Sequence, residues 1–303
     1  MNKMRKQYDF QIGEIGLRVI GEAASPVDVG LKGFRPFATE LTDEPKLTID
    51  TEVDLPIDWW AGGCAKDRTL IDRFDFEDRD CECVLARDAE ARWFGMFPRE
   101  EGYRPIVMRH ALGSSLIECN AGVSGEAPDA SLWRFGLWVA FGLVAVPDGA
   151  IPVHTSTIVC KDRAVLFLGE SGTGKSTHTR LWRENIEGAH LLNDDSPIIR
   201  STAVAYGSPW SGKTPCYRNL HYPIAAIVRL SQAPHNRMRR LSALAALGAL
   251  LPSCPPSFAY DEQLQDAVCE TLSQLISAVP VYHLECLPNA EAAELSYSTI
   301  FGK

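Results

Sequence analysis

A glycine-rich loop that ends in lysine and serine is the clearest chemical signal in this 303-residue chain. Residues 169–176 read GESGTGKS and fit the pattern G-x-x-x-x-G-K-[ST] throughout. Glycines let successive backbone N–H groups turn toward an anion, and the positive end of a following helix favours the same charge. The sequence therefore predicts a nucleotide site, with Lys175 on the β- and γ-phosphates and Ser176 on magnesium. The predicted binding residues are Gly169, Glu170, Ser171, Gly172, Thr173, Gly174, Lys175, Ser176 and Thr177.

Two adjacent carboxylates, Asp194 and Asp195, follow about twenty residues after the lysine. One helix and one short strand separate them from the loop, so we expect them beside it, at the carboxyl end of a neighbouring strand. One carboxylate there can hold magnesium while the other accepts the proton of a substrate hydroxyl. Both are catalytic candidates, and Asp195 is also assigned to the metal with Ser176. The alternative is that Asp195 only caps the turn that follows it.

A basic, turn-rich segment over residues 208–219 (SPWSGKTPCYRN) supplies two more candidates, Lys213 and Arg218. Such a segment can close over phosphates and neutralise charge that develops during transfer. A plain surface loop is the competing interpretation. His154, ten residues before an apolar run, is a further candidate, but its position alone does not distinguish a catalytic role from a structural one.

Two different patterns organise the elements around these residues. From residue 8 to about 120, short period-two segments separated by Gly, Pro and charged residues predict a mostly antiparallel β region, with strands near 47–49, 70–76, 83–85, 92–97 and 115–119. No motif in this region indicates catalysis. His110 and the two tryptophans, Trp59 and Trp60, are more typical of core residues. From residue 151 the pattern predicts a buried strand at 164–168, then a helix at 176–186. Further strands are expected at 190–192, 198–199, 203–206, 224–230 and 281–284, and helices at 243–251, 261–278 and 290–300.

Composition excludes several classes of protein. The net charge is −9, and all of it lies in the first half: residues 1–150 carry 17 basic and 26 acidic side chains, and the remainder carry equal numbers. An acidic chain without a basic run argues against binding to nucleic acid or an anionic membrane. Nine scattered cysteines do not form a disulfide framework, and the apolar run at 132–146 predicts a buried helix. We therefore expect a cytoplasmic protein. The arginines at 237, 239 and 240 are typical of a solvated face.

The motifs resemble the HPr kinase/phosphorylase catalytic domain and its relative, ATP-dependent phosphoenolpyruvate carboxykinase. His154, the loop at 169–176 and the Asp194-Asp195 pair match that family in type, order and approximate spacing. The match is clear over about residues 150–230 and looser to 303. It implies that one aspartate is the general base for a serine hydroxyl, the other contacts magnesium, and His154 tunes the base. The chain lacks the later glycine-rich signature that accompanies phosphorolysis.

The resemblance and the motifs give one expected fold class and domain division. The fold class is α/β: a β-rich N-terminal substrate or partner domain (1–130), followed by a P-loop HPr kinase/phosphoenolpyruvate carboxykinase-like domain that binds ATP and magnesium (131–303). The acidic first half is expected to prefer a basic or neutral acceptor.

The expected function is an ATP- and Mg-dependent kinase that transfers the γ-phosphoryl group to a hydroxyl, a Ser of a protein or peptide. Two alternatives stay open, a kinase for a small hydroxyl metabolite and a non-catalytic protein that senses nucleotide. A homo-oligomer is compatible with the resemblance, because HPr kinases are hexamers.

Overall fold

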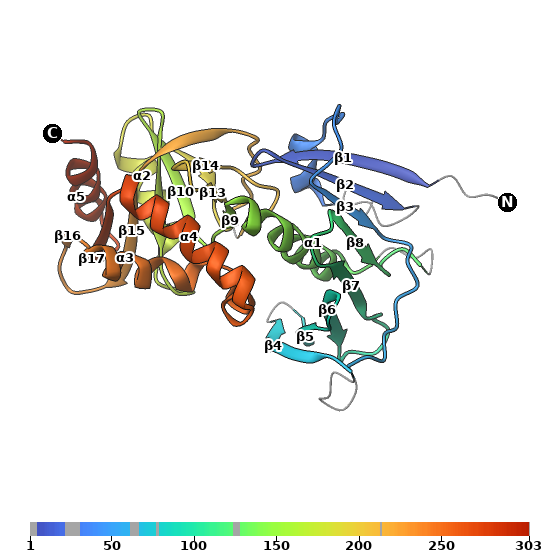
Figure 1. The fold of residues 1–303 in the computed structure, drawn as a ribbon. Helices are drawn as coiled ribbons and strands as arrows, with labels where there is room; N and C mark the ends of the chain where they lie inside the picture. Colours follow the sequence, from blue (N-terminus) through green and yellow to red (C-terminus); the bar gives the residue numbers. More distant parts are fainter. Residues whose placement is uncertain are drawn as a thin grey trace. The chain divides into compact units, whose positions relative to one another are not determined.

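The computed structural model describes residues 5–21, 31–60, 67–76, 79–123, 128–212 and 214–302. It is a mixed α/β protein with two mixed sheets. The chain forms two units, each with its own sheet (Figure 1). Unit 1 comprises Met1–Ala145 and Ser257–Glu262, and unit 2 comprises Val146–Pro256 and Gln263–Lys303.

Unit 1 contains an eight-stranded sheet in the order β1-β2-β3-β8-β7-β6-β5-β4. Most neighbours are antiparallel, as the alternating pattern predicts, but β3 runs parallel to both β2 and β8. The strands are β1 (Lys6–Ile12), β2 (Ile15–Gly21), β3 (Leu47–Asp50), β4 (Thr69–Phe76), β5 (Cys81–Arg87), β6 (Ala91–Pro98), β7 (Ile106–Ala111) and β8 (Leu116–Cys119). Two short 3-10 helices, Lys32–Phe37 and Pro256–Tyr260, accompany them.

Helix α1 (Ala130–Ala145) belongs to unit 1, so this division differs from the expected boundary at residue 130. Its Phe135 ring stacks on Phe76 of β4 at a centroid distance of 4.6 Å. A Cβ added at Gly136 would lie 2.7 Å from the terminal methyl carbons of Met96 and Met108, so glycine lets the helix approach the sheet without displacing these side chains. The apolar surface of α1 thus packs against strands β4, β6 and β7 of the unit 1 sheet.

Helix α1 is also the one stretch of the described residues that is long and apolar enough to span a membrane. With its continuation to Asp148 it covers 19 residues, and 61% of the apolar window is buried within the structure. A core helix passes the same test of length and composition. The predicted burial of this helix is confirmed, and the cytoplasmic location stays a prediction.

Unit 2 contains a nine-stranded sheet with helices on both sides. Its main order is β12-β10-β11-β15-β14-β13-β9, while β17 pairs with β15 and β16 pairs with β17. The strands are β9 (Ala150–Pro152), β10 (Ser156–Cys160), β11 (Arg163–Leu168), β12 (His190–Asn193), β13 (Ile198–Arg200), β14 (Val204–Tyr206), β15 (His221–Gln232), β16 (Arg237–Arg240) and β17 (Val281–Cys286). The helices are α2 (Lys175–Asn185), α3 (Ala243–Leu250), α4 (Glu262–Ala278) and α5 (Ala290–Phe301), with 3-10 turns at Val146–Asp148 and Leu251–Ser253.

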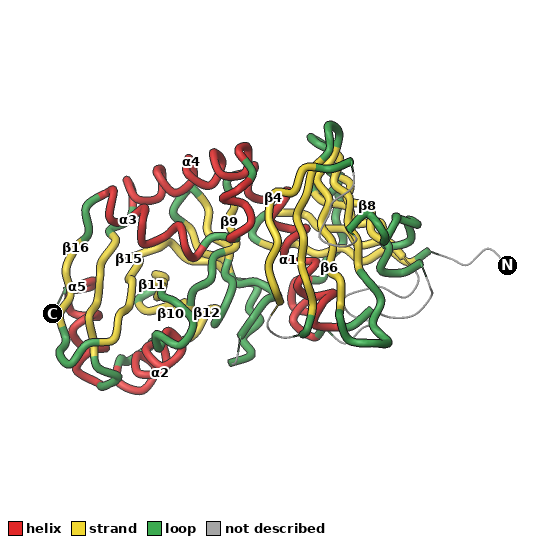
Figure 2. Tube along the Cα trace, turned by 90° about the horizontal axis from the view of Figure 1, so that it is seen from below, coloured by secondary structure: helices red, strands yellow, loops and turns green. Residues whose placement is uncertain are grey.

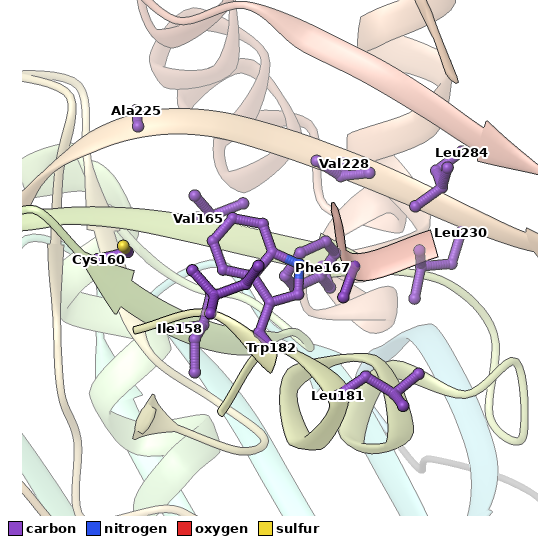
Figure 3. Close-up of a cluster of buried hydrophobic side chains, with 12 residues drawn as sticks. Ile158, Cys160, Val165, Phe167, Leu181, Trp182, Ala225, Val228, Leu230 and Leu284 are labelled. Carbon is purple, nitrogen blue, oxygen red and sulfur yellow. The ribbon is translucent and has the colours of Figure 1, made fainter. Parts of the chain in front are cut away.

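In Figure 2, α2 and α5 lie on one side of these strands and α3 and α4 on the other. The core on the α2 side contains the fully buried Trp182, whose ring lies 5.8 Å from that of Phe167 on β11, and extends to Val228 of β15 and Leu284 of β17 (Figure 3). Strand β11 is apolar from Ala164 onward and buried along that length, as expected for a strand covered on both faces. This packing holds the second half of α2 against β11.

A buried ion pair holds the second segment of unit 1 in place. The guanidinium of Arg92 on β6 donates two hydrogen bonds to the carboxylate of Asp261, at 2.8 and 2.9 Å. Both side chains are almost completely buried. Ser257 adds a hydrogen bond of 2.9 Å to Asp72 on β4. Residues 257–262 are therefore attached to the sheet of unit 1 by charge and hydrogen bonding.

We predict that Asp261→Ala destabilises unit 1 by about 3–5 kcal/mol, because it leaves Arg92 buried without a counter-charge. Urea unfolding measures this loss. The double variant Arg92→Met, Asp261→Leu should recover most of it, since apolar side chains need no counter-charge. The matched control, Arg180→Ala in the exposed pair with Glu184, should cost about 0.5 kcal/mol or less. An Asp261→Ala midpoint equal to the parent's would contradict this account.

Candidate functional site

Strand β10 brings the three predicted parts of the site to one edge of the sheet. It runs antiparallel to β11 on one side and to β12 on the other. Its first residues therefore lie beside the last residues of both neighbours: Ser156 is opposite Phe167, and Thr157 is opposite Asn193. The loop that follows β11, the aspartates that follow β12 and the residues that precede β10 meet there. The expected adjacency of β11 and β12 is wrong in one respect, since β10 lies between them.

The glycine-rich loop (residues 169–176) has the backbone that its glycines permit. Gly169, Gly172 and Gly174 all have positive φ values, of 154°, 81° and 101°. A Cβ at position 169 would overlap the hydroxyl of Thr173, which donates to the carbonyl of Glu170 at 2.7 Å. Larger residues at these positions would strain the turn. The loop ends in α2, whose first residue is Lys175.

The Lys175 side chain folds back over this loop. Its ammonium donates to the carbonyl oxygens of Gly169, at 2.7 Å, and Glu170, at 3.2 Å. Burial lowers the pKa of Lys175 below its ordinary value, while the nearby carboxylates of Asp195 and Asp194 oppose that change. The cation, the loop and the aspartate pair are thus close enough to interact. Ser176 and Thr177 follow in the first turn of α2, with Ser176 exposed.

Asp194 is buried and fully engaged by protein donors. Its Oδ1 accepts from the Ser156 hydroxyl at 2.6 Å, and its Oδ2 accepts from the backbone N–H of Thr214 at 3.2 Å. The Ser156 hydroxyl also lies 2.9 Å from the hydroxyl of Thr179 on α2. A short hydrogen-bonded chain therefore joins β12, β10 and α2. Sequence reasoning missed Ser156 and Thr179; the polar run HTST at 154–157, which leads into β10, is the only signal that marks this place.

Asp195 is more open and is paired with His154. The Nδ1 atom of His154 lies 3.2 Å from Asp195 Oδ1, and the two side chains are 48% and 33% exposed. The Ser196 hydroxyl is 3.2 Å from the other carboxylate oxygen. The backbone holds this pair, because the N–H of Thr155 donates to the Asp195 carbonyl and the N–H of His154 donates to that of Ser253. A carboxylate in this setting can accept a proton, with the imidazole orienting it.

Asn193 shapes the turn that carries both aspartates. Its side-chain oxygen accepts from the N–H groups of Asp195 and Ser196, at 2.9 and 2.8 Å. Its amide nitrogen donates to the Trp210 carbonyl at 2.9 Å, which ties the turn to the 208–219 segment. A Cβ added at Gly212 would lie 3.0 Å from the Asp194 carbonyl, so glycine permits this close approach. The segment thus lies against the aspartates, and its predicted closure over phosphates stays a prediction.

Of the two basic residues of that segment, the structure describes only Arg218. Lys213 lies outside the described residues. Arg218 is exposed and interacts with Cys216, whose thiol lies 3.4 Å from the Leu192 carbonyl of β12. Burial raises the pKa of the Cys216 thiol, and Arg218 opposes that rise. Within the described part of the chain Arg218 forms no ion pair. It lies close to β12 through Cys216, and its predicted role in neutralising phosphate charge stays a prediction.

Helix α2 is anchored by a buried histidine one turn beyond the loop. His178 lies edge-on to Phe167, and its Nε2 is 3.2 Å from the Ser296 hydroxyl of α5. Trp182 donates to the same hydroxyl at 2.9 Å. Burial lowers the pKa of His178 to about 4. The imidazole is therefore neutral at physiological pH, and the helix that begins at Lys175 depends on it staying so.

We predict that stability falls as the pH is lowered from about 6.5 toward 4, because the unfolded chain then binds a proton that folded His178 does not. The loss approaches about 3 kcal/mol at the lower limit. Urea unfolding across this range should show a flatter pH dependence for His178→Gln than for the parent.

The control for this prediction is Trp182→Phe, which loses the other Ser296 contact without removing a titrating group. It should lower stability by the same amount at every pH. A His178→Gln curve parallel to the parent's would contradict the assignment.

Among the described residues no group of three His, Cys, Asp or Glu side chains converges to hold a metal ion. Cys81 and Cys83 are instead buried on β5, as expected for packing cysteines. No protein-family model matches the chain, and comparison with curated proteins gives no match.

Proposed function

We propose that the protein is an ATP-dependent kinase that transfers the γ-phosphoryl group to a hydroxyl, a Ser on a protein or peptide. One observation carries the proposal: a GESGTGKS loop with its lysine beside an Asp-Asp pair, one member of which is paired with a histidine. The earlier resemblance to HPr kinase supports the same activity. In this proposal unit 2 includes a P-loop domain, and the acidic unit 1 contributes to acceptor recognition.

The loop and α2 bind and orient the phosphates in this proposal. Backbone N–H groups of residues 169–176 face the anion, and the start of α2 adds its partial positive charge. Lys175 exchanges its contacts with the Gly169 and Glu170 carbonyls for phosphate oxygens. Because an ammonium has three N–H donors, it can keep one contact with the loop while the others donate to phosphate oxygens and neutralise their charge. Arg218, and Lys213 from the same segment, complete the neutralisation.

Asp195 is the better base of the two aspartates. Each carboxylate has a protein contact on both oxygens, but Asp194 is buried, whereas Asp195 is partly open to solvent and can be reached by an acceptor hydroxyl. The hydroxyl oxygen of the acceptor forms the new bond to phosphorus, its proton passes to the Asp195 carboxylate, and ADP leaves. His154 orients that carboxylate through Oδ1. Asp194 holds the turn and adds negative charge near Lys175.

The residues present fit a magnesium ion. Mg²⁺ prefers oxygen ligands and is usually held by one or two protein groups together with water and substrate phosphates. The exposed hydroxyl of Ser176 is such an oxygen, and water and phosphate oxygens would be the remaining ligands, while Asp195 is kept for the base. The ion would supply charge neutralisation to the transferred phosphoryl group.

We predict that Lys175→Ala weakens ATP binding by about tenfold to a hundredfold, because it removes charge-assisted hydrogen bonds to phosphate. Isothermal titration of the full chain measures this change. The control is Lys161→Ala, an exposed lysine that lies over the Tyr297 ring, and its affinity should equal the parent's. If Lys175→Ala bound ATP as tightly as the parent, the assignment of the glycine-rich loop to phosphate binding would be wrong.

We predict that Asp195→Asn leaves ATP affinity within about twofold and lowers transfer by about a hundredfold to ten-thousandfold, the range for loss of a general base. His154→Gln acts through Asp195, so its loss should be smaller and should come with an altered pH profile. Equal transfer rates for Asp195→Asn and the parent would exclude this residue as the base.

Labelled ATP distinguishes the acceptor classes. The purified chain is incubated with γ-labelled ATP and a cell lysate, and the products are separated into protein and small-molecule fractions. Label in protein supports the proposal, and label in a small molecule supports a metabolite kinase. ATP binding that raises the melting temperature, without transfer to either fraction, supports a nucleotide-sensing protein.

A further inference from the structure

Charged side chains gather on the face of the unit 2 sheet that is turned away from α2. Figure 3 shows Val228, Leu230 and Leu284 in the core cluster that contains α2 residues. Successive side chains of a strand point to opposite faces. Arg229 on β15 and His283 on β17 therefore lie on the other face.

Strand register places three of these side chains in one row. Arg229 is opposite His283 where β15 and β17 run parallel, and Arg239 is opposite His283 where β16 and β17 run antiparallel. Side chains directly opposite on neighbouring strands begin about 5 Å apart. We call Arg229, His283 and Arg239 the arginine row.

Hydrogen bonds define the state of the central imidazole. Arg239 Nη2 lies 3.3 Å from His283 Nδ1, and since a guanidinium has no acceptor, Nδ1 accepts. The ring proton is then on Nε2, which donates to the Ser231 hydroxyl at 2.8 Å. Burial lowers the pKa of His283, the charges of Arg239 and Arg229 lower it further, and Glu285 opposes them.

The row carries excess positive charge. Within the described residues, neither Arg229 nor Arg239 has a carboxylate within 4.0 Å. In the next register row Glu285 is opposite Ser231 and Arg237, so it is the nearest carboxylate to the row on this face and lies beside a third arginine. Two unpaired guanidinium groups on one face match an oxyanion, because their planar donors bind such groups in pairs.

The row also adjoins the glycine-rich loop. Leu168, the last residue before the loop, is opposite Arg229 in register. Gln232, at the end of β15, donates to the Gly172 carbonyl at 3.2 Å. Arg229 is one strand from β11 and His283 is two, so an anion centred on the row would lie about two strand spacings, roughly 10 Å, to the side of the loop's first residue.

We propose that Arg229 and Arg239, with His283 between them, bind an oxyanion of the phosphate or carboxylate class at a site separate from the glycine-rich loop. Binding is linked to uptake of a proton from solvent. Once Nδ1 is protonated it no longer accepts from Arg239, so the guanidinium turns to the anion and the imidazolium N–H becomes a further donor. The inference does not depend on the kinase proposal, since the row contains none of its residues.

Sulfate is the probe, because it does not titrate in the range where histidine does. The full chain is titrated with sulfate while the histidine side-chain NMR signals are followed, with His283→Gln to assign the signal. The signal should move toward the imidazolium position. The dissociation constant should be at least about threefold lower at pH 6 than at pH 7.5, since the anion favours the protonated ring.

Matched variants test the donors. Arg229→Gln and Arg239→Gln should each weaken sulfate binding by about tenfold or more, the loss expected for a charge-assisted contact. Arg240→Gln is the control, because Arg240 is on the same strand but opposite Tyr282, which packs on the other face. Lys175→Ala separates the two anion sites and should keep the His283 response.

A parallel titration with acetate distinguishes the two sources of oxyanion. A larger His283 response to sulfate assigns the row to phosphate groups, and a larger response to acetate assigns it to carboxylates. No movement of the His283 signal with either anion would overturn the proposal, as would sulfate affinity that Arg239→Gln leaves unchanged.

Discussion

The direction of strand β10 is the constraint on which the candidate site depends. Because β10 runs against both β11 and β12, its polar first residues lie between the end of one strand and the end of the other. Ser156 then reaches Asp194 on one side and Thr179 of α2 on the other. Backbone pairing therefore sets the spacing between the glycine-rich loop and the aspartates, and side-chain hydrogen bonds only refine it. Sites built on paired strands in this way hold their groups more precisely than sites built on loops.

The adjacent aspartates show how one dipeptide acquires two environments. Asp194 points into a buried network of donors, and Asp195 points to a partly open histidine. The Asn193 side chain produces this divergence by fixing the turn between them. Two like carboxyl groups with different surroundings are what a site needs to give them different roles. The geometry thus favours a division of labour that the sequence left open.

Local features of the chain were predictable, and long-range ones were not. The glycine-rich loop, β11 and α2 follow from a contiguous motif and from apolar runs. β10 begins with two polar residues followed by three apolar ones, and β16 is mostly arginine, so neither shows the alternation that marks a strand. The Ser156 contact with Asp194 spans 38 residues, and no local rule signals it. Helix α1 was expected from its composition, but only packing against Met96 and Met108 assigns it to unit 1.

Residues 257–262 have a consequence for the order in which the protein is made. Domains synthesised on the ribosome usually fold from the N-terminus as each is completed. Unit 1, however, is complete only when Asp261 reaches Arg92, and by then β9 to β16 and α3 have already left the ribosome. Until that moment a buried arginine of β6 lacks its counter-charge. The first sheet to be synthesised therefore reaches its final stability only after most of the second has been translated.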